Sequence, residues 1–317
     1  MYWVERKTRL PVTMSAQPAS YLVSGASGML GSALRQALAA RNVRVLQLVR
    51  RAPVSAEELQ WNPAASPAIA DSESLEGLAA AIHLSGANVA AHRWTRAYKR
   101  EMTSSRVDST RALAVTLARL RQPPPVLLVA SAVGFYGNRG EELLDETSVA
   151  GSGFLANVCR QWEAAAQPAV DAGIRVVNLR FGVVLGPGSG ALARMEPVFR
   201  LGLGGKLGSG RQWMSWISLD DALAAILFVL DRPSIAGPVN LTAPNPVKNA
   251  DFTRTLAREL HRPAILPAPA LALRLALGEI AGETLLASAR VYPSKLSAAG
   301  FRFAHPTITR ALAAAFE

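Results

Sequence analysis

Sulfur and histidine are scarce in this chain. Its 317 residues include a single cysteine, Cys159, and four histidines. One cysteine excludes a disulfide within the chain and fits a reducing compartment, so we expect a cytoplasmic protein. The histidines His83, His92, His261 and His305 are dispersed, with no H-x-x-x-H or C-x-x-C spacing, and we therefore expect no metal site. A G-x-S-x-G elbow is also missing, which argues against a serine hydrolase.

Long apolar runs are missing too. Half of the residues are hydrophobic (50%), yet no stretch of about 18 residues is free of charges and turn residues. We therefore expect no membrane span. Residues 1–19 are polar and basic and lack the apolar core of a secretory signal, so we expect a disordered leader, with translation starting at Met1 or at Met14.

Lysine is rare although the chain is strongly basic. Only five of the 34 basic residues are lysines, and the net charge is +11. The arginines are scattered along the chain rather than gathered among aromatic residues, as a nucleic-acid surface requires. We interpret the positive charge as a general preference of this sequence for arginine over lysine, although an affinity for polyanions stays open. The expected partners are an anionic cofactor and a small-molecule substrate, not nucleic acid or a membrane. We expect the protein to be a monomer or a homodimer.

What the chain does have is a regular alternation of apolar runs and helical patterns. This order is typical of βαβ units on a buried parallel sheet, and it predicts a doubly wound α/β fold. The expected strands are 21–25, 43–49, 80–86, 125–132, 174–182 and 237–242, and the expected helices between them are 29–41, 93–120, 154–171, 190–201 and 219–231.

The first βα unit carries three glycines at G-x-x-G-x-x-G spacing in "YLVSGASGMLGSAL" (21–34). Gly25 closes the strand, Gly28 lets the backbone approach a pyrophosphate, and Gly31 lets the helix pack against the strand. Phosphates favour the free N–H groups and the dipole at a helix N-terminus. Small residues in such a turn can be purely structural, but this position favours dinucleotide binding. The expected contacts are Gly25, Ser27, Gly28, Met29 and Leu30.

The end of the second strand bears on the choice of dinucleotide. An acid there binds the ribose 2′-hydroxyl of NAD, whereas this chain reads "VLQLVRRAP", with Arg50 and Arg51 at that point. Guanidinium groups match a 2′-phosphate in charge and geometry. The alternative is two more surface arginines. The sequence favours NADP(H).

Several stretches resemble the extended short-chain dehydrogenase/reductase superfamily and, within it, the atypical subgroup of epimerase family proteins. This subgroup is of the NAD-dependent epimerase/dehydratase type and is also labelled cell-division-inhibitor-like. The resemblance covers nearly the whole chain from about residue 20, includes the subgroup's C-terminal tail domain, and implies a Rossmann-type fold that binds NADP(H). The stretches include "SGASGMLGSAL", "IHLSGANV" (82–89), "SAVGFYGNRG" (131–140), "LRFGVVLGPGSGAL" (179–192), "LGLGGKLGSGRQWMSWISLDD" (201–221) and "ARVYPSKLSAAGF" (289–301).

The resemblance also predicts a domain division and further cofactor contacts. We expect residues 20–182, with 215–242 returning to them, to form the NADP(H)-binding Rossmann domain. Residues 183–214 and 243–317 would form a smaller, mostly helical C-terminal substrate lobe. Glu101 and Arg106 lie near the position where the superfamily commonly has a structural Asn, and either contact the nicotinamide side or form a solvated ion pair. Backbone contacts are expected from Leu84, Ser85, Gly86 and Leu185.

The residues that usually perform catalysis in this superfamily are absent. Typical members use a Tyr-x-x-x-Lys pair on the helix after the fifth strand and a Ser or Thr at that strand's end. If Glu163 marks the register here, Leu155 occupies the Tyr position and Cys159 the Lys position. Counting back from Tyr136 places Ala132 at the Ser/Thr position.

Three interpretations of this departure stay open. The protein uses another proton relay, with Tyr136 and Ser131 as our catalytic candidates and Cys159 and Arg106 as weaker ones. Alternatively, hydride transfer needs only a protonated substrate or a water. Finally, the chain is a non-catalytic NADP(H)-binding sensor or interaction protein. We expect an NADP(H)-dependent oxidoreductase or epimerase of unknown substrate.

The substrate candidates come from "GKLGSGRQWMSW" (205–216). Lys206, Gln212, Trp213 and Trp216 lie in or beside a glycine loop, where aromatic rings can stack a planar or sugar-like ligand. They fit the packing of a hinge between lobes equally well.

Overall fold

Seven parallel strands form one sheet at the centre of the computed structural model, which describes residues 19–317. The order is β11-β7-β5-β4-β1-β2-β3, and its reversal between β1 and β4 makes the sheet doubly wound. The strands are β1 (Ser20–Ser24), β2 (Arg44–Val49), β3 (Glu58–Gln60), β4 (Ala80–His83), β5 (Val126–Ala132), β7 (Arg175–Phe181) and β11 (Gly237–Leu241).

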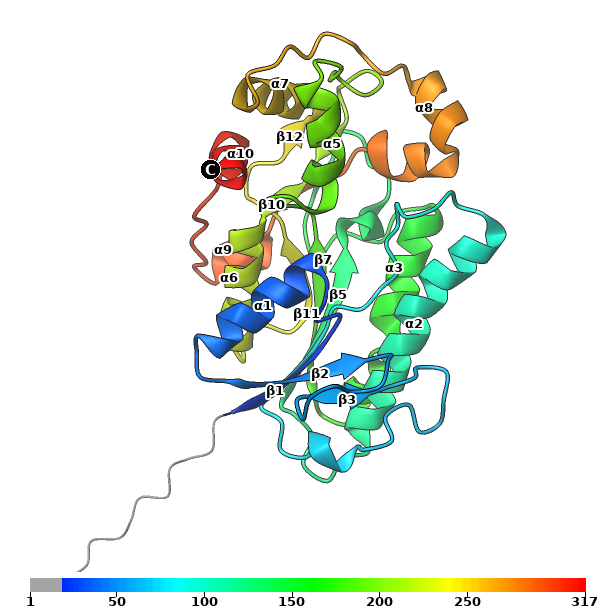
Figure 1. Cartoon of the computed structure of the whole chain (residues 1–317), viewed down its shortest axis with the longest axis vertical. Helices are drawn as coiled ribbons and strands as arrows, with labels where there is room; N and C mark the ends of the chain where they lie inside the picture. The colour runs from blue at the N-terminus through cyan, green and yellow to red at the C-terminus, as the bar shows by residue number, and fades with distance from the viewer. Residues whose placement is uncertain (1–18) are drawn as a thin grey trace, which may run out of the picture.

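Helices cover both faces of this sheet (Figure 1). On one face α1 (Met29–Ala39) packs beside α6 (Leu219–Leu230), and on the other α2 (Arg96–Ala118) packs against α3 (Phe154–Ala164) and α4 (Gln167–Asp171). Each helix buries an apolar stripe against the strands, because such residues recur at helical spacing. The fold class expected from the alternation is thus confirmed.

The predicted strands and helices are all present, with two differences. The short strand β3 was not expected, because its sequence "ELQ" has one apolar residue and no run. The expected helix 154–171 is divided into α3 and α4, with Pro168 in the first turn of the second helix. The predicted leader, with Met1 and Met14, lies outside the described residues.

The C-terminal residues form a second core beyond the end toward which β5 points (Figure 1). Leu192, Phe199, Trp216, Phe252 and Leu312 are at its centre. The expected boundaries between the two parts stay a prediction. The remaining elements of the described chain are η1 (Glu73–Leu75), η2 (Val133–Tyr136), β6 (Leu143–Leu144), β8 (Val183–Leu185), α5 (Gly190–Arg200), β9 (Trp213–Met214), β10 (Trp216–Ser218), β12 (Val247–Lys248), α7 (Asn249–Glu259), α8 (Ala270–Leu277), η3 (Ala281–Leu285), β13 (Arg290–Val291), α9 (Ser294–Ala298) and α10 (Ile308–Phe316).

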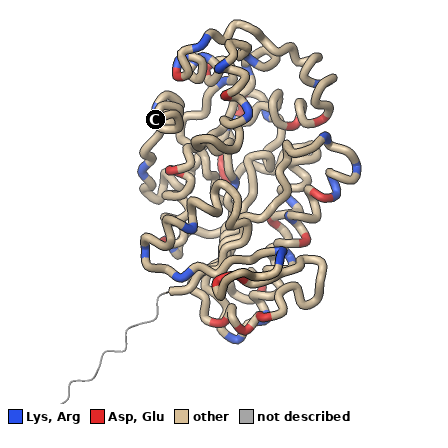
Figure 2. Tube along the Cα trace, in the orientation of Figure 1, with Lys and Arg blue, Asp and Glu red and all other residues tan. Residues whose placement is uncertain are grey.

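Lysine and arginine residues are spread along the whole described trace and mixed with aspartate and glutamate (Figure 2). This distribution agrees with a compositional origin of the net charge of +11. Within residues 19–317 no helix is both long and apolar enough to cross a membrane.

Candidate functional site

The glycine turn between β1 and α1 is shaped by close backbone contacts. Gly25 has a φ of +69°, and a Cβ there would lie 2.8 Å from the carbonyl carbon and oxygen of Leu84. A Cβ on Gly31 would overlap the carbonyl oxygen of Gly25 and lie 2.8 Å from the Cα of Ala26. Both positions therefore require glycine: Gly25 because the turn is packed against the segment that follows β4, and Gly31 because α1 is packed against the backbone of the turn itself.

Gly28 differs from the other two glycines because the space above it is open. An added Cβ would meet only the carbonyl oxygen of Gly25 within 4 Å, at 3.4 Å, among the described residues. Gly28 is also the N-cap of α1, and neither a side-chain cap nor an acidic residue in the first turn occupies that end. Ser27 and Gly28 are exposed. The arrangement leaves the first N–H groups of α1 free to receive an anion.

Two other predicted segments adjoin this turn. Leu84 and Ser85 contact Gly25, as the close approach shows. Leu185 is buried at the end of β8, and the Met29 sulfur lies 3.2 Å from the Cβ position of the next residue, Gly186. The structure thus brings together the glycine turn, the turn after β4 and the end of β8 at the carboxyl edge of the sheet.

The adjacent arginines at the end of β2 lie in different surroundings. Arg51 donates two hydrogen bonds to the Glu58 carboxylate, at 2.7 and 2.6 Å, and a third to the carbonyl of Ala52. Arg50 is exposed and makes no hydrogen bond or ion pair with any residue of the described chain. Arg50 is therefore the arginine whose charge is free for a ligand.

Glu101 and Arg106 point to different places although both lie on α2. Glu101 is exposed and borders a shallow surface hollow with His92 and Tyr98. Arg106 turns inward and lies on Gly86. No ion pair joins the two within residues 19–317. The contact of Glu101 with the nicotinamide side stays a prediction.

A buried hydrogen-bond network lies behind the end of β5. The Glu163 carboxylate accepts hydrogen bonds from Arg180 Nε and Nη2, both at 2.8 Å, and from the Ser131 hydroxyl at 2.7 Å. Arg180 Nη1 also donates to the Tyr136 hydroxyl at 3.0 Å. That hydroxyl donates to the Asn240 side chain at 2.7 Å or to a backbone carbonyl. Ser131 and Tyr136 are thus already engaged by protein partners.

Burial limits the chemistry of these side chains further. Tyr136 is 0% exposed, and burial raises the pKa of its hydroxyl above the ordinary value. Cys159 is buried beside Gly134, and burial raises the pKa of its thiol to about 12. Leu155 contacts the same glycine position and has no polar group. Ser131 and Tyr136 are thus both buried and hydrogen-bonded within the protein, and their catalytic roles stay a prediction.

Buried polar partners of the turn were missed by the sequence reasoning. His83 Nδ1 lies 2.6 Å from the Ser24 hydroxyl and Nε2 lies 3.1 Å from the Ser109 hydroxyl. Burial lowers the pKa of His83 to about 4, so the ring is neutral at pH 7. Ser24 precedes the glycine turn, and this network fixes the end of β1. No sequence signal beyond a polar residue in an apolar strand pointed to it.

The four predicted substrate residues divide into two pairs. Trp216 is 0% exposed and donates to the carbonyl of Asn245, and Gln212 is buried with bonds to the carbonyls of Leu207 and Leu285. Both stabilise the second core. Lys206 is exposed and Trp213 is half-buried, so only these two are accessible to a ligand.

Trp213 is surrounded by charged side chains. Its indole N–H donates to the Glu141 carboxylate at 2.6 Å, and Arg290 and Lys248 lie 4.5 and 5.1 Å from its ring centroid. Such cation–π contacts hold the ring in place.

A family model described as "NAD dependent epimerase/dehydratase family" matches residues 21–241. The chain belongs to this family. A second model, a domain of unknown function, matches residues 268–315, where the tail domain was expected. The predicted resemblance is confirmed.

Relatives of this family member match it over nearly its whole length. An epimerase family protein of Mycobacterium bovis is 47% identical over 92% of this chain and 95% of its own. A chloroplastic epimerase family protein of Arabidopsis thaliana is 37% identical over 98% of this chain and 91% of its own. The crystal structure of human epimerase family protein SDR39U1 with NADPH is 32% identical, covers 94% of this chain and 99% of its own, and superposes with a TM-score of 0.86.

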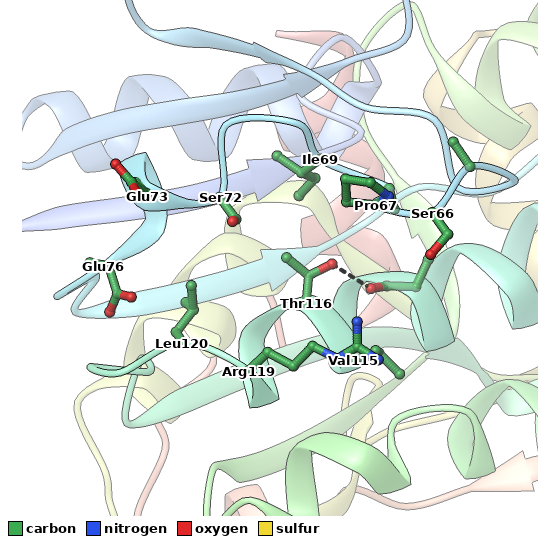
Figure 3. A pocket seen from close by; sticks show the side chains of 13 residues that line it. Ser66, Pro67, Ile69, Ser72, Glu73, Glu76, Val115, Thr116, Arg119 and Leu120 are labelled. Carbon is green, nitrogen blue, oxygen red and sulfur yellow. Dashed lines mark hydrogen bonds between the residues drawn. The ribbon is translucent and has the colours of Figure 1, made fainter.

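A further hollow lies away from the predicted site (Figure 3). A cavity of about 240 Å³ lies between the C-terminal half of α2 and the loop 65–76. Pro67, Ile69, Thr116 and Arg119 line it, and none of the predicted site residues does. Residues 19–317 contain no group of three or more His, Cys, Asp or Glu side chains that could hold a metal ion.

The glycine contacts predict different tolerances at two turn positions. Gly31→Ala should lower the free energy of unfolding by about 1–3 kcal/mol, because the new Cβ overlaps backbone. Gly28→Ser should change it by less than about 0.5 kcal/mol, since serine is a good N-cap residue. Denaturant unfolding of both variants measures the difference, and equal stabilities would contradict this account of the turn.

The network at β5 predicts a structural role for the Tyr136 hydroxyl. Tyr136→Phe should lower the free energy of unfolding by about 1–3 kcal/mol, because Arg180 and Asn240 lose a buried partner. Tyr292→Phe is the matched control, since its hydroxyl has no hydrogen bond within the described chain. Thermal unfolding compares them; a Tyr136→Phe protein as stable as the control would refute the role.

Proposed function

We propose that this protein binds NADP(H) across the carboxyl edge of its sheet. In a doubly wound sheet the ligand binds where the strand order reverses, which here is between β1 and β4. The adenosine half would lie over β1 and β2, and the nicotinamide half over β4 and β5. NADPH in the structure of the human epimerase family protein supports this proposal, because the two chains share the fold and 32% of residues.

The residues at this edge fit the cofactor. The open space above Gly28 and the uncapped N-terminus of α1 suit the pyrophosphate. Arg50 at the end of β2 suits a 2′-phosphate, since its guanidinium has no partner in the described chain. This free cation is the observation that carries the proposal.

Arg51 has a supporting part in this arrangement. Glu58 lies on β3 opposite Gln47 of β2, close to the end of the strand where the ribose would bind. A free carboxylate there would repel a 2′-phosphate. Arg51 and the Val54 N–H both donate to that carboxylate, and these hydrogen bonds, the one from Arg51 above all, lower the pKa of Glu58. We infer that Arg51 neutralises Glu58 rather than contacting the cofactor.

We propose that the protein transfers a hydride between NADP(H) and a small molecule, as an oxidoreductase or an epimerase-like enzyme. When bound, NADP(H) supplies or accepts a hydride. Trp213 and Lys206 are the accessible predicted groups on the C-terminal side and would orient the substrate. Because Ser131 and Tyr136 are engaged in the buried network, a proton would come from the substrate or from water rather than from these residues.

A second function is favoured by one specific observation. The positions nearest the end of β5 hold a buried tyrosine, a leucine and a thiol whose pKa is raised to about 12. Because burial raises the pKa of both the tyrosine and the thiol, neither is a ready proton donor or acceptor, and such an edge suits a binding role. The second candidate is a non-catalytic NADP(H)-dependent sensor.

The free Arg50 predicts cofactor preference. NADPH should bind more tightly than NADH, and Arg50→Ala should weaken NADPH binding about 10- to 100-fold while NADH changes little, because charged hydrogen bonds contribute about 1.5–3 kcal/mol. Arg41→Ala is the matched control, since it removes the same charge from an exposed arginine that pairs with Asp231. Calorimetry measures both; equal affinities of the wild type for NADPH and NADH would contradict the proposal.

Turnover separates the two candidate functions. We expect NADPH oxidation or NADP reduction with at least one carbonyl, hydroxyl or nucleotide-sugar compound, and we expect Tyr136→Phe and Cys159→Ser to retain it. The reason is that both groups are buried. Absorbance at the nicotinamide band follows the reaction. Tight NADPH binding without turnover of any compound would favour the sensor.

A further inference from the structure

Arg290 on β13 carries a guanidinium that has no polar partner in the described chain. Its Cζ lies 4.5 Å from the ring centroid of Trp213, and the side chain forms no hydrogen bond or ion pair with any group of residues 19–317. The Nε atom is buried as well as unpaired. An unpaired buried donor is rare in a folded protein, and a ligand that supplies an acceptor stabilises it.

The carboxylate that binds Trp213 is already engaged by another cation. Glu141 accepts a hydrogen bond from the Trp213 indole N–H at 2.6 Å and one from Lys248 Nζ at 3.1 Å. These bonds, the one from Trp213 above all, lower the pKa of Glu141. Lys248 and Arg290 thus lie on one ring beside a single carboxylate, and the group of four residues carries an excess positive charge.

Other arginines of restricted exposure differ from Arg290 because they have oxygen acceptors. Arg180 pairs with Glu163 at 2.8 Å. Arg175 donates to three backbone carbonyls, and Arg106 donates to two. Arg290 is half-buried like Arg106 and Arg175, but its partner is an aromatic ring. A ring face holds a cation in place and leaves its N–H groups without an oxygen acceptor.

Strand β13 places Arg290 beside the end of β5. Arg290 pairs with Leu143 of β6, and β6 follows η2, which continues directly from β5. The next residue, Val291, is 0% exposed and packs with Tyr136 of η2. Neighbouring strand residues point to opposite faces, so Arg290 extends over Trp213 and stays outside the buried network. Arg290 thus lies on the C-terminal side of the strand over which we place the nicotinamide half.

We propose that Arg290 binds an oxyanion group of the substrate, a carboxylate or a phosphate, while Trp213 holds the guanidinium in place. The substrate class is then a small organic acid or phosphate ester. The inference rests on the proposed function, because it assumes that the substrate lies between the nicotinamide half and the C-terminal domain. A planar guanidinium binds either group through two parallel hydrogen bonds. The cofactor's 2′-phosphate is not the anion concerned, since its expected partner Arg50 follows β2, three strands away from β5 in the sheet.

Anion titrations of the full chain test this site through the fluorescence of Trp213. With saturating NADP present, phosphate and acetate are added at constant ionic strength, and acetamide serves as the neutral counterpart of acetate. We expect a saturable change with phosphate, with acetate or with both, and none with acetamide. The anion that binds identifies the group that Arg290 recognises. Trp213→Phe should remove the change, which identifies the reporter among the six tryptophans.

Three variants assign the anion to Arg290. Arg290→Gln should weaken its binding about 10-fold or more, because charged hydrogen bonds are lost. Arg290→Lys keeps the charge without the planar fork and should fall between the wild type and Arg290→Gln. Arg232→Gln is the matched control, because Arg232 lies 4.7 Å from the ring centroid of Phe228 in a similar contact. This control should change the anion affinity less than about twofold, since salt screens a distant exposed charge.

NADPH calorimetry separates this inference from the proposed function, and circular dichroism checks that each variant is folded. If the wild type does not bind NADPH, the proposed function is refuted and the inference with it. If the wild type and Arg290→Gln bind NADPH equally but neither anion gives a saturable change, the inference alone fails. It also fails if Arg290→Gln keeps the wild-type anion affinity, if Arg232→Gln loses that affinity, or if the change persists in Trp213→Phe, because the anion then binds elsewhere or responds only to net charge.

Discussion

One buried ion pair, between Glu163 and Arg180, determines what the carboxyl edge of this sheet is able to do. It joins α3 to β7, and both partners lie in the interior of the protein. A buried pair is costly unless its remaining hydrogen-bonding groups are satisfied, and here the Ser131 and Tyr136 hydroxyls satisfy them. Asn240 extends the network to β11. The hydroxyl groups at the end of β5 are therefore engaged in stabilising the fold.

The same edge keeps its capacity to bind anions. The N-terminus of α1 is uncapped above Gly28, and Arg50 has no partner within residues 19–317. The terminus of α1 lacks the stabilisation that a side-chain cap would supply, whereas the exposed guanidinium of Arg50 is solvated by water and costs little. The hydroxyls of Ser131 and Tyr136 have partners within the protein, whereas Arg50 and the N-terminus of α1 have none within residues 19–317. Binding of a dinucleotide is therefore better supported than any particular reaction.

Sequence patterns were sufficient to predict the strands of the central sheet, but not to predict which partners a single side chain contacts. Short apolar runs identified six of the seven strands of the central sheet, and the three-residue β3 is the one that they missed there. Arg50 and Arg51 are identical neighbours, and their difference depends on Glu58, which lies seven residues away from Arg51 on another strand. Trp216 is buried by contacts that include Asn245, 29 residues further along the chain. Glu101 and Arg106 are five positions apart on a helix, which turns them roughly 140° from each other at 3.6 residues per turn.

The C-terminal domain reaches the candidate site through its acidic residues. Glu283 accepts a hydrogen bond from the N–H of Leu155 at the start of α3, and Glu279 pairs with Lys99 near the start of α2 at 2.7 Å. Both helices begin at the carboxyl edge, so the domain of unknown function, matched over residues 268–315, fixes the ends of the two helices that carry Arg106 and Cys159. A carboxylate at the N-terminus of α3 also occupies a place that an anionic ligand could otherwise use. The contrast with the uncapped α1 is physical: one helix terminus at this edge is closed by the protein itself, and the other is open for a phosphate.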